Sequence, residues 1–138
     1  MTKNYTFLLN LAKGEMDLST DQLAVALTDT DPTVNVDEYA DITSPVDASY
    51  FSGGTPFYVT TTSLTQTTGT TKLVVQPLTL TSTGAGLVPD FRYVVVYDQT
   101  SGHVIGYEDL GEEVSLNGAL GDTLIINFDT TNGVLQLA

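Results

Sequence analysis

Cysteine and tryptophan are both absent from this chain of 138 residues, and histidine occurs only once. The lack of cysteine excludes disulfides, thiolate zinc sites and cysteine nucleophiles together. No apolar run approaches the length that a membrane-spanning helix requires. These absences remove several classes of enzyme and of membrane protein, and no strong catalytic motif replaces them.

Basic residues are equally scarce, since four of them stand against 17 acidic residues and the net charge is −13. Binding to a phosphate backbone needs clustered lysine and arginine, so nucleic acid is excluded as a partner. A polybasic anchor on anionic lipid is excluded for the same reason. Residues 5–11 are too short for the apolar part of a secretory signal. We therefore expect synthesis in a cytoplasm, without a cleaved signal and without a membrane partner.

Threonine is the commonest residue, with 23 occurrences, and it favours strands together with valine and tyrosine. The length suits one domain, here 1–138. Short strands alternate with turns rich in Gly, Pro, Asn and Asp, at intervals of roughly 8–12 residues. We predict an all-β fold, either a β-sandwich or jelly-roll-like, with a β core over 20–138 and one short N-terminal helix. Strand count does not fix pairing order, so both architectures stay open.

The helix is predicted within segment 1–14. Asn4 is a suitable N-cap, and Gly14 suits the left-handed residue that ends a helix. Phe7 and Leu11 widen an apolar stripe that follows the spacing i, i+3, i+4, i+7. The members of that stripe are Tyr5, Leu8, Leu9 and Ala12. A helix of about ten residues is marginal alone, so we expect this face to pack on something.

The strand pattern contains two informative positions. Thr68-Gly69 is predicted to close a hairpin, and Gln76-Pro77 to form a bulge or a bend between sheets, because the apolar phase changes there. The run 91–97 is apolar on both faces and is expected to be a central strand, whereas 22–28 is expected to be half-buried. The predicted strands are 22–28, 39–43, 57–66, 71–81, 91–97, 103–110, 113–116, 123–128 and 134–137.

Two catalytic interpretations are weak. His103 lies beside Ser101, but neighbours in a loop seldom converge on one reacting atom as a hydrolytic triad requires. Paired carboxylates could hydrolyse glycosides. The candidates, however, crowd around one glycine and have the pattern of a solvated edge: Glu108, Asp109, Glu112 and Glu113. We predict no enzymatic activity and no cofactor.

Calcium is the metal best suited to this composition, because hard cations take oxygen ligands. The loop 29–38 supplies several such ligands, although its spacing does not match an EF-hand. They are Asp29, Asp31, Asn35, Asp37 and Glu38. An acidic solvated loop is the simpler explanation. Calcium binding at this loop nevertheless remains open.

Apolar groups at the edges of the β core are the remaining candidates for a binding surface. They are Tyr5, Leu8 and Leu9 in the helix segment, and Tyr50 and Phe51 in the loop 45–56. They either cover the end of the β core or dock on a partner, since aromatic residues anchor interfaces. No catalytic, metal-binding or cofactor-binding residue is assigned.

Several short segments, taken in order, carry a resemblance. They are Ala26-Leu27-Thr28-Asp29-Thr30, Ala40-Asp41-Ile42-Thr43, Gly53-Gly54, Gly69-Thr70-Thr71-Lys72-Leu73, the run 91–98, Ile105-Gly106-Tyr107 and the run 121–129. Over residues 20–137 the chain resembles a family of structural proteins of tailed bacteriophages, among which we place the capsid decoration, or cement, proteins.

The resemblance implies a β-sandwich on the outer surface of the virion head, made in the host cytoplasm. Such a protein would bridge major capsid protein subunits, as a dimer or trimer, and stabilise the shell. The helix, the strand edges and the terminal strand 134–137 are the contact elements expected, the last by strand addition. A tail- or fibre-associated module that binds a host glycan, with calcium at residues 29–38, remains an alternative function.

Overall fold

A computed structural model describes residues 1–33, 35–53 and 55–137. Strands make up 44% of it, arranged in antiparallel sheets, and the described residues contain one short α-helix. The predicted all-β, sandwich-like fold with a short helix is therefore confirmed. Gly54 of the double glycine, Val34 of the acidic loop and Ala138 lie outside the described residues.

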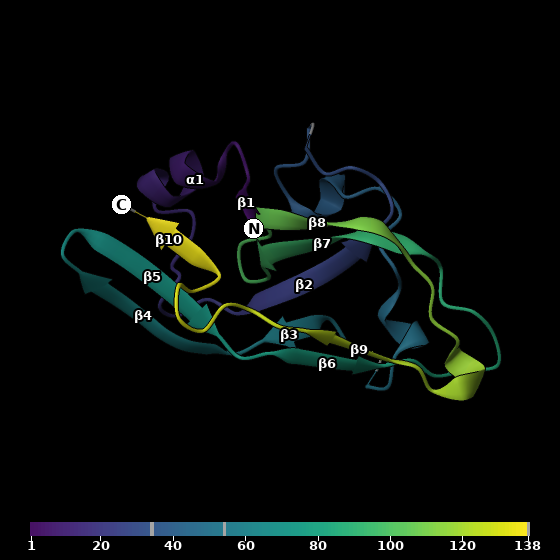
Figure 1. Ribbon diagram of the computed structural model, residues 1–138. Helices are drawn as coiled ribbons and strands as arrows, with labels where there is room; N and C mark the ends of the chain where they lie inside the picture. Colours follow the sequence, from purple (N-terminus) through teal and green to yellow (C-terminus); the bar gives the residue numbers. More distant parts are fainter. Residues whose placement is uncertain (34, 54, 138) are drawn as a thin grey trace.

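The larger layer is a five-stranded antiparallel sheet in the order β1-β8-β7-β2-β3 (Figure 1). Its strands are β1 (Thr2–Lys3), β8 (Val104–Val114), β7 (Phe91–Asp98), β2 (Leu23–Thr28) and β3 (Phe57–Val59). The predicted central strand is confirmed, because β7 occupies the middle position and seven of its eight residues are buried.

The second layer consists of two smaller sheets joined end to end. Strands β10 (Leu135–Leu137), β5 (Thr70–Val75) and β4 (Thr61–Thr67) pair in that order, and β6 (Leu78–Thr81) pairs with β9 (Thr123–Ile126). The chain passes directly from β5 into β6 and from β9 towards β10 (Figure 1). The layer is therefore built mainly on two long antiparallel segments, β5–β6 and β9–β10, and each segment is interrupted between its two strands.

Two short segments between strands, a bend and a hairpin turn, shape this layer. Gln76-Pro77 separates β5 from β6, as the change of apolar phase predicted. The turn at Thr68-Gly69 has positive φ at both residues, 49° and 84°, which matches the twist of a tight hairpin. The predicted strand 57–66 was wrong as one element, because the chain changes layers at Thr60: β3 pairs with β2, whereas β4 pairs with β5.

The core has two parts because β2 is buried on both faces, not on one as predicted. Leu23, Val25 and Leu27 pack between the layers. Ala24 and Ala26 pack on the outer face, in a second cluster formed with residues of β7, of β8 and of the segment that follows β2, which we call the covering loop. That loop brings Val36 and Ile42 over the sheet, which sequence periodicity alone does not reveal.

Two local predictions need correction. The segment predicted as a strand at 39–43 forms a 3₁₀ turn, η1 (Tyr39–Asp41). The predicted strands 103–110 and 113–116 form one strand, β8, whose register against β7 shifts between Phe91 and Tyr93. Beyond β8 the chain forms another 3₁₀ turn, η3 (Gly118–Leu120), with the Asn117 side chain as its cap.

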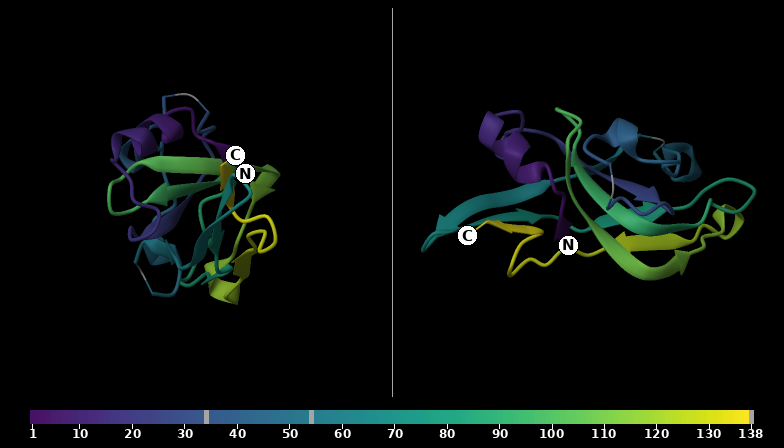
Figure 2. Two further views of the ribbon diagram at one scale, coloured as in Figure 1. Left: turned by 90° about the vertical axis from the view of Figure 1, so that its left-hand side faces the viewer. Right: turned by 90° about the horizontal axis from the view of Figure 1, so that it is seen from above.

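The hairpin β4–β5 forms one end of an elongated molecule, and η3 lies at the other end (Figures 1 and 2). The helix α1 (Phe7–Lys13) covers the hairpin end beside β10. Among the described residues, no helix combines the length and the hydrophobicity needed to cross a membrane.

Candidate interaction surface

Helix α1 presents an apolar face to solvent. Its buried residues are Phe7 and Asn10, whereas Tyr5, Leu8 and Leu9 are 64%, 54% and 55% exposed. The predicted stripe therefore does not pack on the core. We call these three exposed residues the α1 face. The helix is also shorter than predicted, since it begins at Phe7, although it ends at a left-handed Gly14 as expected.

Polar side chains decide which face of the helix is buried. Asn4 is not the N-cap; its Nδ2 donates to the carbonyl oxygen of Val36 at 2.5 Å, and its Oδ1 accepts from the amide of Thr6 at 2.9 Å. The Thr6 hydroxyl and Asn10 Nδ2 both donate to Oδ1 of Asp37, the second at 3.0 Å. The Thr6 hydrogen bond holds the pKa of Asp37 below its usual value. These bonds fix α1 to the covering loop and leave the α1 face outside.

His103 lies near the hydrogen bonds that hold α1 to the covering loop, but it does not form a catalytic triad. Its Nε2 is 3.4 Å from Glu15 Oε2, and its Nδ1 is 4.0 Å from Glu38 Oε1. The Ser101 hydroxyl donates to Asp98 Oδ2 at 2.8 Å, so the serine is committed to an aspartate and not to the imidazole. The arrangement supplies no activated nucleophile.

The neighbouring carboxylates on β8 do not share a site. Arg92 makes two hydrogen bonds to Asp109, at 2.7 and 2.8 Å, and these keep the pKa of that carboxyl below its usual value. Glu108 forms an ion pair with the terminal amine at 2.7 Å. Adjacent strand residues point to opposite faces. A catalytic pair of these two residues is therefore not assembled.

The acidic loop does not gather a set of metal ligands. Within the described part of the chain, no three acidic or histidine side chains come together as a cation site requires. Asp31 accepts from the amide of Thr33 at 2.9 Å, and Asp37 faces α1. The Asp31 carboxylate thus orders the loop itself, and the Asp37 carboxylate holds α1 against the loop. No observation favours the calcium interpretation.

The aromatic pair in the loop 45–56 divides between core and surface. Tyr50, in the 3₁₀ turn η2 (Ala48–Tyr50), is 37% exposed. Phe51 is only 2% exposed and packs edge-on against Phe57, with ring centroids 5.2 Å apart. Its expected role as a partner contact is corrected, because the ring fills the core and offers no surface.

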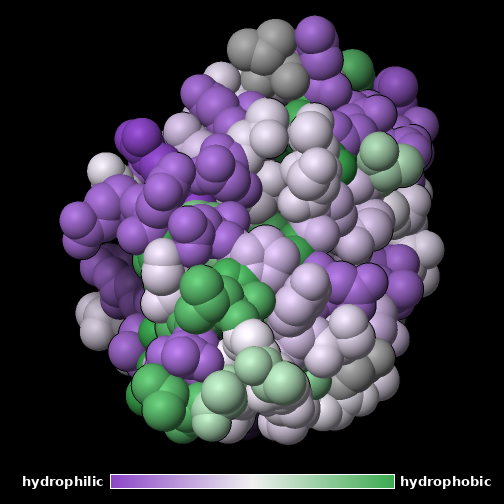
Figure 3. Space-filling view, turned by 90° about the vertical axis from the view of Figure 1, so that its right-hand side faces the viewer, coloured by the Kyte–Doolittle hydropathy of each residue, from purple (hydrophilic) through white to green (hydrophobic). Residues whose placement is uncertain are grey.

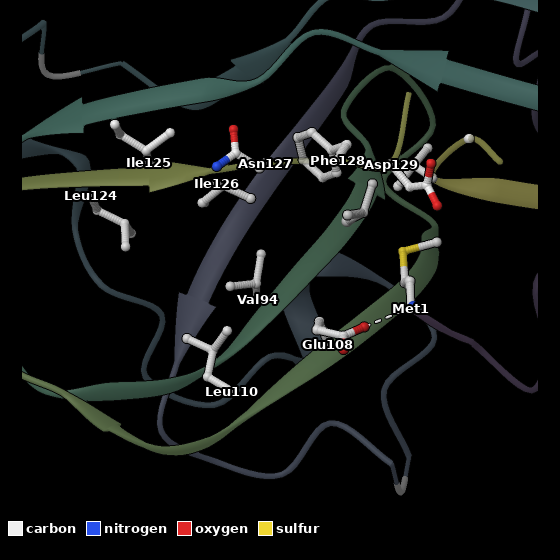
Figure 4. A pocket seen from close by; sticks show the side chains of 13 residues that line it. Met1, Val94, Glu108, Leu110, Leu124, Ile125, Ile126, Asn127, Phe128 and Asp129 are labelled. Atoms are coloured by element: carbon white, nitrogen blue, oxygen red, sulfur yellow. Dashed lines mark ion pairs between the residues drawn. The ribbon is translucent and has the colours of Figure 1, made fainter. Parts of the chain in front are cut away.

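A cleft that sequence reasoning missed lies between the two layers, beside Met1 (Figure 4). It has a volume of about 330 Å³. Val94 and Leu110 point into it from β7 and β8, and Leu124 from β9, whereas Ile125 points away (Figure 4). In the sequence, only the strand predicted at 123–128 indicated one wall of this cleft. Its lining is mainly apolar, with acidic groups at one end.

The η3 end carries a second exposed apolar group. Leu87 and Leu120 are 71% and 76% exposed, and Leu87 bridges to Asn117, the residue before η3. Figure 3 views this end and shows apolar residues gathered low in the view, beneath a largely polar surface. The group offers a matched surface against which the α1 face can be compared.

Neither a protein family, a curated protein nor a solved structure matches this chain.

Proposed function

We propose that this chain is a non-catalytic structural protein of a tailed-phage particle that binds the outer surface of the head and stabilises the shell. The observation that carries the proposal is the α1 face, where three large apolar side chains stay more than half exposed: Leu8 and Leu9 on the anchored helix, and Tyr5 just before it. The ordered resemblance to virion proteins supplies the class of partner, the major capsid protein.

The exposure of the α1 face favours a role in binding a partner. Single exposed apolar residues are normal, but adjacent ones on one element are typical of interaction sites. Tyr5, followed three and four residues later by Leu8 and Leu9, can supply the aromatic anchor that interfaces use. The hydrogen bonds to Asp37 hold the helix before any partner arrives, so little entropy is lost when it binds.

Adhesion alone can perform this function. A protein that binds the assembled shell and not its separated subunits stabilises the shell by mass action. Many weak contacts across one lattice act together. The net charge of −13 opposes crowding of free copies and repels DNA.

Cosedimentation with expanded, DNA-free heads of the phage that encodes the chain tests the proposal. We expect the protein in the pellet in a saturable amount, and heads that carry it to withstand a higher temperature. Leu8→Glu should weaken binding about tenfold or more, because a charge would be buried at the contact. Leu120→Glu is the control, with the same change at a leucine of the η3 end that is even more exposed than Leu8.

Two results would count against the proposal. Protein that stays in the supernatant at saturating concentration would exclude the head as its partner. Binding that survives Leu8→Glu and is lost in Leu120→Glu would move the contact to the η3 end and remove the α1 face from the argument.

A further inference from the structure

One edge strand of this molecule differs from all the others in length. The strands at sheet edges are β1 with two residues, β3 and β10 with three each, β6 and β9 with four each, and β4 with seven. Short edges are a common protection against pairing with another chain. The edge of β4 lacks this protection and is about 24 Å long at the usual rise per residue.

The strand β4 also lacks charge and proline, two other usual protections, and its register against β5 is regular from Ser63 to Thr67, after a single shift between Thr61 and Ser63. Its sequence, Thr-Thr-Ser-Leu-Thr-Gln-Thr, contains no charge and no proline, and none of its residues is buried. Its ladder hydrogen bonds run to β5. No further hydrogen bond of a described residue involves Thr61–Thr67, so the outward amides and carbonyls of β4 are available to another strand.

Charge is distributed unevenly around this edge. All 17 acidic residues lie in 1–47 or 90–138, so 48–89, which contains β3, β4, β5 and β6, has none. The only charged side chain of that segment is Lys72, on β5. The hairpin extends beyond the body of the molecule (Figure 2). A second copy could therefore approach along β4 while the acidic bodies stay apart.

The sequence of β4 is complementary to itself when two copies run antiparallel about Leu64. Thr61 then faces Thr67, Thr62 faces Gln66, and Ser63 faces Thr65, while Leu64 faces its own copy. Threonine and serine pairs across strands are favourable, and no like charges meet. Leu64 is 38% exposed before pairing, so the contact would cover an apolar side chain.

We propose that β4 is a self-association edge, at which two copies of this chain pair antiparallel about Leu64 and join their β10-β5-β4 sheets into one six-stranded sheet. The partner is a second copy because the edge is self-complementary in sequence and free of acidic residues. The proposal stands apart from the docking of the α1 face, since it concerns a different element and needs no capsid.

The dimer should be weak and should depend on salt. Pairing of one strand covers less than the about 1,600 Å² of a standard stable interface. Each copy also carries a charge of −13, and salt screens the repulsion between the two bodies. We therefore expect a monomer near 14.7 kDa in dilute solution and low salt. A species of twice that mass should form as the concentration of protein or of salt rises.

Sedimentation velocity over a concentration series, with matched charge variants, tests the edge. Leu64→Lys and Leu64→Glu should each weaken the dimer about tenfold or more, because like charges then meet at the two-fold axis. Mixing the two variants should restore dimers, since opposite charges now meet. Ile125→Lys, at a 57% exposed position on another edge strand, β9, should leave the dimer unchanged.

A second measurement covers the case in which a charge at residue 64 disturbs the hairpin. The chain has no cysteine, so Leu64→Cys introduces the only thiol. Exposure to dissolved oxygen should cross-link Leu64→Cys into a dimer, and Ile125→Cys should remain a monomer under the same conditions. A monomer at every concentration and salt, or equal cross-linking of both cysteine variants, would overturn the proposal. Head binding lost in Leu64→Lys with a wild type that stays monomeric would assign the edge to the capsid instead.

Discussion

Strands β7 and β4 are nearly equal in length, yet they stand at opposite extremes of burial. β7 has eight residues and β4 has seven. In β7 only Arg92 is not buried, whereas β4 has no buried residue. β7 lies at the centre of a five-stranded sheet, and β4 lies at the edge of a three-stranded one.

The difference teaches that these two strands serve different purposes. Phe91, Val94 and Val96 of β7 belong to one part of the core. Val95 and Tyr97 belong to the other, so the stability of the fold constrains the sequence of this strand. The threonines of β4 are compatible with a strand but bury nothing, so folding alone does not require their order. Stability and association can thus be changed independently, and each prediction below tests that separation.

The largest effect is expected at Phe91, which is fully buried in β7. Phe91→Ala should lower the free energy of unfolding by about 3–5 kcal/mol, because it removes apolar contacts and leaves a cavity. Urea denaturation monitored by circular dichroism measures the loss. A loss below about 1 kcal/mol would mean that β7 does not hold the core together.

The next effect is expected at Asp37, which anchors α1. Its pKa is lowered in the folded state, so the stability that it contributes is present above the unfolded value near 3.8 and is lost as pH falls through the folded value. Asp37→Asn should cost about 1.5–3 kcal/mol at neutral pH and much less in acid, because hydrogen bonds to a charged group are the stronger ones.

Urea denaturation at neutral and acid pH, with amide hydrogen exchange of Phe7–Lys13, measures this contribution. Glu112→Gln, at an exposed carboxylate of β8, is the matched control and should behave as the wild type at both pH values. Equal losses in Asp37→Asn at both pH values would indicate a packing defect in place of a lost charge-assisted bond.

Asp98 should show the opposite pH dependence and a smaller effect. Burial at the end of β7 raises the pKa of its carboxyl, while hydrogen bonds from Ser101 partly offset that rise. Its contribution is therefore most favourable below the unfolded value near 3.8, and it declines as pH rises through the folded value. The stability of Asp98→Asn relative to wild type should increase from acid to neutral pH in the same urea titrations; a constant difference would contradict the burial argument.

Local signals in the sequence predicted the features that local physics controls. Thr68-Gly69 and Gly14 needed positive φ, and Gln76-Pro77 broke the apolar phase, so the hairpin, the helix end and the bend were all predictable. The position of β7 followed because a strand that is apolar on both faces needs cover on both.

Contacts between distant segments defeated the same reasoning elsewhere. Both faces of α1 are apolar, and the choice between them depends on Asn10 and Asp37, which lie 27 residues apart. Phe51 reads as a loop residue until Phe57 is seen beside it. The open edge of β4 was also beyond prediction, because a strand becomes an edge only through the partners it lacks.

The smallest change in stability is expected at the edge itself. Leu64→Ala should alter the free energy of unfolding by only about 0.5 kcal/mol in dilute solution, because surface substitutions away from special features have little effect. Its side chain is already 38% exposed, so little buried area is lost. In concentrated solution the same variant should fall further behind the wild type, since a dimer that forms only in the folded state adds stability by mass action. Thermal unfolding at two protein concentrations separates the two contributions, and a concentration-independent loss of several kcal/mol would place Leu64 with the core residues of β7.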